Sequence, residues 1–103
     1  MKKITVYPDT QTCTPKTAKA TTGEPTVFIF KLDNSNDWEW AGTSPVAVQA
    51  GGAEFSESFV HTKQGGVVLF DKNTYPNTYK YTVTAINKTT GQIVPIDPFI
   101  QNQ

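Results

Sequence analysis

Nine carboxylates, one histidine and one cysteine are the side chains of this 103-residue chain that could support acid–base or nucleophilic chemistry. Asp97 differs from the other carboxylates because Pro98 follows it, and the proline nitrogen carries no N–H. Proline restricts the preceding residue to extended geometry, so Pro98 limits where the Asp97 carboxyl group can point. Such bonds are weak because the carboxylate can attack its own carbonyl carbon while the prolyl nitrogen is protonated. A plain turn at the end of a strand is the simpler interpretation of the same dipeptide.

Other hydrolytic and metal chemistry is not indicated. Ser56 and Ser58 precede His61 by five and three residues, so on a regular strand both point to the face opposite the histidine. Cys13 has no positive neighbour closer than Lys16 that could lower its thiol pKa. One cysteine, one histidine and one methionine are too few soft ligands for a dedicated metal site. We therefore expect neither a metal nor a cofactor.

Charge and hydropathy argue against nucleic acid and membrane as partners. The nine basic residues are all lysine and balance nine acids, so neither a cationic field nor a guanidinium fork is available for phosphates. No apolar run approaches the roughly 20 residues of a spanning helix. The basic start at residues 1–3 looks like a signal peptide, but Pro8 and Asp9 interrupt it before an apolar core develops. We expect a cytoplasmic protein with a reduced thiol.

The apolar pattern predicts an all-β chain. Apolar residues recur with period two or in short solid runs, and Pro, Gly, Asn and Asp interrupt them every roughly eight to twelve residues. A loose edge strand is expected around Cys13 and Ala18. The other expected strands cover residues 3–7, 26–32, 38–40, 46–48, 54–60, 67–70, 78–86 and 92–96, and an apolar segment at 97–100 closes the chain. Seven or eight strands in one domain, residues 1–103, predict a two-layer antiparallel immunoglobulin-like β-sandwich.

Particular positions within these strands carry further expectations. Glu57 alternates with two phenylalanines, so a strand end or a bulge must keep it in water. Pro95 confines its strand to an edge or to a non-bonded position. A turn before residues 79–81 looks like a tyrosine corner, in which one ring points inward and its hydroxyl bonds the backbone. Trp38 and Trp40 either belong to the core or form a stacking platform with Tyr75.

The chain resembles the DP-EP family of small bacterial β-sandwich proteins. The resemblance rests on Glu24-Pro25 and, more specifically, on the closing pattern that runs from residues 79–83 through Asp97-Pro98 to Asn102. It implies a sandwich, a dimer and an aspartic-type self-cleaving peptidase, and among catalytic positions only Asp97 matches. Asp9-Thr10-Gln11 lacks the glycine of pepsin-type motifs, so a water-activating carboxylate pair would need another partner for Asp97. We expect that partner to be Asp71, at the end of a neighbouring apolar strand.

Two functions therefore remain open. The first is a self-cleaving aspartic-type peptidase with Asp97 and Asp71 as catalytic residues and a peptide as substrate. The second is a non-catalytic binding or assembly module that uses edge strands or exposed aromatic side chains. The net charge is neutral, and only Pro95 hinders an edge strand from pairing with the same strand of a second copy. We therefore expect a homodimer.

Overall fold

A computed structural model of the chain describes residues 1–61 and 65–103, which form eleven strands and one short 3₁₀ helix. The strands are β1 (Lys2–Tyr7), β2 (Thr12–Thr14), β3 (Thr17–Lys19), β4 (Thr26–Leu32), β5 (Trp38–Trp40), β6 (Val46–Val48), β7 (Phe59–Val60), β8 (Val67–Asp71), β9 (Asn77–Asn87), β10 (Ile93–Ile96) and β11 (Phe99–Asn102), and the helix is η1 (Gly52–Glu54). These elements confirm the predicted all-β sandwich.

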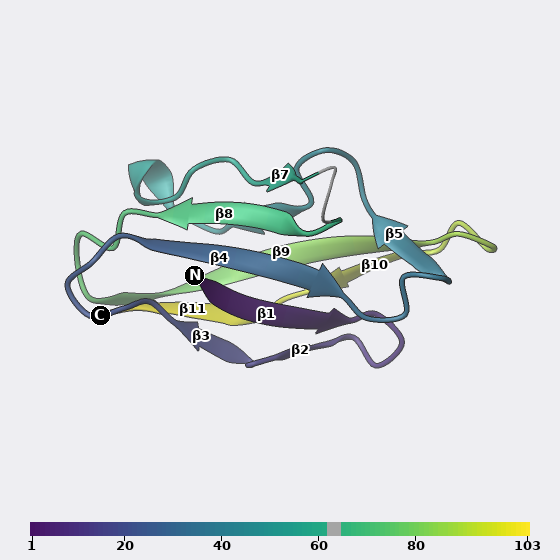
Figure 1. Cartoon of the computed structure of the whole chain (residues 1–103), viewed down its shortest axis with the longest axis horizontal. Helices are drawn as coiled ribbons and strands as arrows, with labels where there is room; N and C mark the ends of the chain where they lie inside the picture. The colour runs from purple at the N-terminus through teal and green to yellow at the C-terminus, as the bar shows by residue number, and fades with distance from the viewer. Residues whose placement is uncertain (62–64) are drawn as a thin grey trace.

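The strands form two sheets that pack face to face, one in front of the other in Figure 1. The first sheet has the order β2-β1-β4-β8-β7. The long strand β9 organises the second sheet, because β10 and β11 pair along one side of it and β5 and β6 along the other. Strand β3 lies outside β11.

Both sheets are mixed, which corrects the expectation of a purely antiparallel sandwich. β1 runs parallel to β4, and β3 runs parallel to β11, whereas the remaining pairs are antiparallel. The parallel pairs arise because the chain turns back after β1 to make β2 and then crosses to the other sheet as β3. There are more strands than expected because the segment around Cys13 and Ala18 makes two strands and the last strand breaks at Asp97-Pro98. The immunoglobulin-like detail stays a prediction.

The core lies between the two sheets and follows the period-two pattern of the strands. In β9, alternation favours an inward position for Tyr79, Tyr81, Val83 and Ala85; the last three are fully buried, whereas Tyr79 is partly exposed. Tyr81 meets Phe30 of β4 edge to face at 5.4 Å between ring centroids. The predicted tyrosine corner is wrong. Tyr81 is the inward ring, but its buried hydroxyl bonds no backbone group within the described ranges, and the Cys13 thiol is the polar group beside it.

Two of the finer expectations are confirmed by strand register. Pro95 pairs with Thr84, whose N–H and C=O bond to Pro45 and Ala41 on the other side of β9. The nitrogen of Pro95, which carries no hydrogen, therefore points to the outer edge of β10, and no backbone hydrogen bond between β10 and β9 is lost. The strand expected at residues 54–60 is wrong in its extent, because only β7 forms there and Phe55 makes an isolated bridge with Asp71. Since Phe59 pairs with Val68, one extra residue bulges between the two pairings, and Glu57 is exposed.

Candidate functional site

Asp97 lies at the break between β10 and β11 and points away from the core. It is exposed, whereas its neighbours Ile96 and Pro98 are buried. The Thr82 hydroxyl of β9 donates a hydrogen bond of 2.6 Å to Asp97 Oδ1. A groove of about 420 Å³ beside it is lined by Gln11, Thr12, Cys13, Lys16, Ile96, Asp97 and Pro98. Asp97 is therefore the only carboxylate among the lining residues in the described part of the chain.

Asp71 lies at the end of β8, between the two sheets, and only 1% of its surface is exposed. Its Oδ1 accepts a hydrogen bond of 2.9 Å from the Asn73 backbone N–H. Burial raises the pKa of Asp71, and the nearby Glu54 charge raises it further, while hydrogen bonds from Asn73 and Asn102 act in the opposite direction. Its second oxygen, Oδ2, has no hydrogen-bond partner among the described residues.

The structure does not bring Asp97 and Asp71 together. Side chains along the last segment alternate, so Asp97 faces outward while Asn102, which interacts with Asp71, faces inward. The sheet itself thus separates the two carboxyl groups. The two residues therefore do not form the expected carboxylate pair. The expectation rested on the apolar strands that precede each residue, and these do not show which face of a sheet a carboxyl group occupies. Their catalytic roles stay predictions.

Glu54, which no pattern in the sequence singles out, is the carboxylate that lies near Asp71. The Asn102 amide nitrogen, Nδ2, donates to Glu54 Oε1 at 3.1 Å, and the Thr74 backbone N–H donates a short hydrogen bond to the same oxygen. Asn102 is 1% exposed, and its Oδ1 has no partner in the described ranges. No sequence signal could have found this cluster, since its members come from η1, β8 and β11.

Asn73 holds the segments around this cluster together. Its Nδ2 donates to the backbone oxygens of Thr21 at 2.7 Å, Glu24 at 2.9 Å and Gln103 at 3.0 Å. Its Oδ1 accepts from the Gln103 N–H at 3.0 Å. One of these acceptors is therefore the backbone carbonyl of Glu24, which belongs to the Glu24-Pro25 dipeptide on which the DP-EP resemblance partly rests. Asn73 has a φ of +52°, a left-handed conformation that asparagine tolerates better than most residues.

The two tryptophans do not form a platform with Tyr75. Trp38 is buried in the core, as one of the two interpretations predicted. Trp40 packs partly against the core, and its indole N–H donates to the Gly65 carbonyl at 2.8 Å. Tyr75 lines a different groove, beside Glu54.

Exposed aromatic side chains gather instead on the outer face of the first sheet. Phe59 is 43% and Phe70 46% exposed, and their rings stack with centroids 6.1 Å apart. Strand register places Phe59 and Ile29 on either side of Val68, and Val27 beside Phe70. Ile29 and Val68 are nearly buried, although residues 1–61 and 65–103 place no further strand or helix over this face. We call these five residues the Phe59–Phe70 patch.

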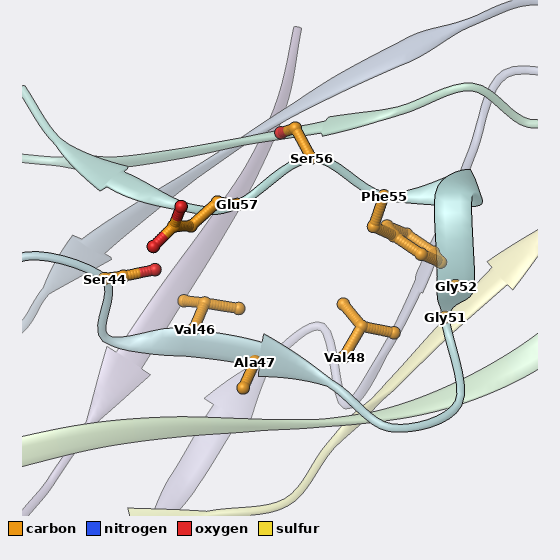
Figure 2. Close-up of a pocket in the computed structure, with 9 residues that line it drawn as sticks. All are labelled: Ser44, Val46, Ala47, Val48, Gly51, Gly52, Phe55, Ser56 and Glu57. Carbon is orange, nitrogen blue, oxygen red and sulfur yellow. The ribbon is translucent and has the colours of Figure 1, made fainter.

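A small polar groove opens at the side of the sandwich, between β6 and the segment that precedes β7 (Figure 2). Its volume is about 260 Å³, and Glu57 and Ser44 supply its side-chain polar groups, whereas the Oγ of Ser56 accepts from the Phe70 N–H at 3.0 Å. Ser58, which follows Glu57, is buried, and its Oγ accepts from the Val46 N–H at 3.0 Å and donates to the Val46 carbonyl at 2.8 Å. The described lining contains no histidine, cysteine or second carboxylate, so the groove lacks a catalytic pair.

Comparison with known proteins adds no identification. No protein-family model matches the chain, and no match was found among curated proteins. The resemblance to the DP-EP family therefore stays a prediction. Within residues 1–61 and 65–103, no helix is long and apolar enough to cross a membrane. In the same ranges, no three His, Cys, Asp or Glu side chains gather where they could hold a metal ion.

Proposed function

We propose that this protein is a non-catalytic assembly module that pairs with a second copy of itself through the Phe59–Phe70 patch. The observation that supports the proposal is the stacked pair of half-exposed rings on the outer face of the first sheet, over which the described residues place no further strand or helix. Exposed aromatic side chains that gather beside other apolar residues on one face are typical of an interaction site. We include in the proposal the cytoplasmic location expected from the sequence, where Cys13 stays reduced.

The charges of the chain favour a second copy as the occupant. The formal net charge is zero, so two copies do not repel each other at long range. The patch itself contains no charged side chain. Two lysines share this face: Lys3 of β1 pairs with Ile29, and Lys31 follows Ile29 by two residues on β4. The stacked rings lie on β7 and β8, so a two-fold contact centred on them lies away from Lys3 on β1.

The edges at β10 and β7 are poorer contact surfaces than this face. Pro95 presents no N–H at the outer edge of β10, so a strand added there loses a hydrogen bond. β7 has only two residues and follows a bulge, which shortens the edge available for pairing. Association through side chains of the sheet face thus replaces the edge-strand pairing considered from the sequence.

Sedimentation equilibrium of the full chain tests the proposal. Wild type is expected to be a dimer at micromolar to millimolar concentrations, and Phe59→Ser/Phe70→Ser a monomer with an unchanged circular dichroism spectrum. Tyr75→Ser is the matched control, because this exposed aromatic side chain lies outside the patch and its loss should leave the dimer intact. A wild type that stays monomeric, or a double variant that still dimerises, refutes the proposal. Fractionation of cells that express the tagged chain tests the location.

A second candidate function is self-cleavage, the activity that the family resemblance implies, and the chemistry of the Asp97–Pro98 bond makes that bond its candidate target. The hydrogen bond from Thr82 supports it, because a carboxyl group held in one orientation loses less freedom when it attacks. The neutral carboxyl group attacks the Asp97 carbonyl carbon, the bond to the Pro98 nitrogen breaks, and the carboxyl proton passes to that nitrogen. Water then opens the cyclic anhydride. This route needs one carboxyl group rather than a pair, and the substrate is the chain's own peptide bond.

Intact-mass measurements from pH 4 to pH 8 separate this candidate from the first. Cleavage between Asp97 and Pro98 should be faster on the acid side, absent in Asp97→Asn and slower in Thr82→Val. Wild type that remains full length for days removes the candidate. Equal fragmentation in Asp97→Asn removes Asp97 as the reacting group.

A further inference from the structure

The groove beside Asp97 lies between β2, the outer strand of the first sheet, and β10, an outer strand of the second. Cys13 and Lys16 belong to one wall, and Ile96, Asp97 and Pro98 belong to the other. Its volume of about 420 Å³ lies toward the lower end of the range that is typical of small-molecule sites, roughly 300–1,000 Å³. The groove is therefore large enough for a small ligand.

The buried and exposed residues of this groove differ in polarity. Cys13, Ile96 and Pro98 are buried, whereas Lys16 and Asp97 are exposed and carry charges. The groove thus has an apolar floor and a charged rim. Small-molecule sites commonly combine apolar surface with a few polar groups that fix the orientation of the ligand. A ligand that fits here has an apolar group for the floor and charged groups for the rim.

The two charges on the rim have opposite signs and do not pair with each other. The Thr82 hydroxyl holds Oδ1 of Asp97, and Oδ2 accepts no hydrogen bond from the described residues. The Lys16 ammonium group makes no ion pair or hydrogen bond within residues 1–61 and 65–103. The Lys16 carbonyl accepts from the Phe99 N–H at 3.1 Å, which ties its backbone to the segment that carries Asp97. Both charged groups are therefore held at one groove and can bind groups of a ligand.

We propose that this groove binds a small zwitterion with an apolar side chain, of which a free amino acid such as leucine is the simplest example. The ligand's ammonium group donates to Asp97 Oδ2, and its carboxylate accepts from Lys16. Its side chain contacts the apolar floor. Charge-assisted hydrogen bonds at the two ends set its direction in the groove. This binding requires neither the dimer nor the self-cleavage proposed above.

The charges of the rim disfavour simpler ligands. An anion without an ammonium group gains from Lys16 but is repelled by Asp97, and a cation without a carboxylate meets the reverse situation. An uncharged apolar ligand removes water from both charged groups without replacing the lost hydrogen bonds. A zwitterion provides a partner for each group. Because both charges are exposed, the affinity is expected to be weak, in the millimolar range.

Titration of the full chain with L-leucine at pH 7, followed by proton–nitrogen-15 spectra, tests the groove. Leucine should cause saturable shifts at the backbone amides of Thr12, Cys13 and Asp97, which line it. N-acetyl-leucine lacks the ammonium group, leucinamide lacks the carboxylate and glycine lacks the apolar side chain, so each should bind about three- to tenfold more weakly. If leucine gives no saturable shift up to its solubility limit, or if the three analogues bind as tightly as leucine, the proposal is overturned.

Two variants assign the rim charges to the two ends of the ligand. Lys16→Gln should weaken leucine about three- to tenfold but leave leucinamide unchanged, because leucinamide has no carboxylate that could lose its partner. Asp97→Asn should weaken leucine by a similar factor and leave N-acetyl-leucine no weaker. Lys19→Gln and Asp33→Asn are the matched controls, since both positions are exposed and do not line the groove. If each variant weakens leucine and its analogue equally, or if the controls weaken leucine as much, the proposal fails.

The same measurements separate this proposal from the two functions above. Lys16→Gln keeps Asp97 and Thr82 in place, so it should lose affinity for leucine without changing any self-cleavage. The described lining contains no residue of the Phe59–Phe70 patch, so Phe59→Ser/Phe70→Ser should bind leucine as wild type does. Glycyl-leucine, whose charges lie farther apart, distinguishes a short peptide from a free amino acid, and saturable binding of either supports the zwitterion. Loss of leucine binding in the folded double variant would show that the site is not this groove.

Discussion

Trp38 donates its indole N–H to Asp9 Oδ1 at 3.0 Å and so ties the turn after β1 to the start of β5. The Asn34 amide extends the contact, because its Nδ2 donates to Asp9 Oδ2 at 3.0 Å and to Asp37 Oδ2 at 2.9 Å. Two segments that are distant in the sequence, the turn after β1 and the turn that leads into β5, are therefore joined through one carboxylate and one amide. The hydrogen bonds from Asn34 and Trp38 lower the pKa of Asp9.

The Asp9 contact predicts a loss of stability in acid. Because the folded pKa lies below the model-peptide value of 3.8, the contribution is present above that value and is lost as the pH falls through the folded pKa. Asp9→Asn should therefore flatten the decrease in stability below about pH 4. Trp38 fluorescence during urea unfolding from pH 2 to pH 5 measures the effect. Asp33→Asn, at an exposed carboxylate nearby, should behave as wild type, and an identical flattening there would contradict the assignment.

Asn73 is expected to be among the most sensitive positions of the chain. Asn73→Ala removes the amide that donates hydrogen bonds to three backbone carbonyls. It also places alanine, which disfavours positive φ, in a left-handed backbone conformation. Together these effects should lower the free energy of unfolding by about 2–4 kcal/mol. Asn73→Gly loses the same amide but accepts the backbone, so its cost should be about 1 kcal/mol smaller. Urea unfolding compares the two variants. Equal losses would show that the backbone conformation contributes nothing.

The thiol of Cys13 is expected to be unreactive in the folded protein. Burial raises its pKa to about 11, so at pH 8 only about one thiol in a thousand is ionised. Ellman's reagent should therefore react slowly with native protein and quickly after unfolding in urea. Thr12→Cys in a Cys13→Ser background is the control, since residue 12 is exposed and should react quickly when folded. Fast native labelling of Cys13 would mean that the surrounding strands open readily.

The Tyr81 hydroxyl is expected to contribute nothing favourable to stability. It is buried with no nitrogen or oxygen partner in the described part of the chain, and its neighbour, the Cys13 thiol, is only a weak hydrogen-bonding group; burial together with that thiol raises the pKa of Tyr81. Tyr81→Phe removes this unsatisfied group and should leave the free energy of unfolding unchanged or raise it by up to about 1 kcal/mol. Urea unfolding, with Tyr79→Phe as the control at a partly exposed ring, measures the change. A loss above about 1 kcal/mol would indicate that the hydroxyl has a partner, such as a buried water.

The sequence by itself determined the strands and several of their local features. Period-two alternation is a property of consecutive residues, so the burial of Tyr81, Val83 and Ala85 follows from the order of residues in one strand. The edge position of Pro95 and the bulge at Glu57 were also predictable. Each follows from one residue's own chemistry: a missing N–H in the first case and a charge that must stay in water in the second.

Only the tertiary structure decided which of these residues meet. The sequence predicted Asp71 as the partner of Asp97, but the carboxylate that lies near Asp71 is Glu54, which comes from a different element and is bridged to it by Asn102. Likewise, the parallel pairing of β1 with β4 depends on where the chain crosses between the sheets. The physical reason is that alternation specifies which side of its own strand a residue takes. The neighbour of that strand, and the sheet face that becomes buried, are chosen by the packing of all the strands together.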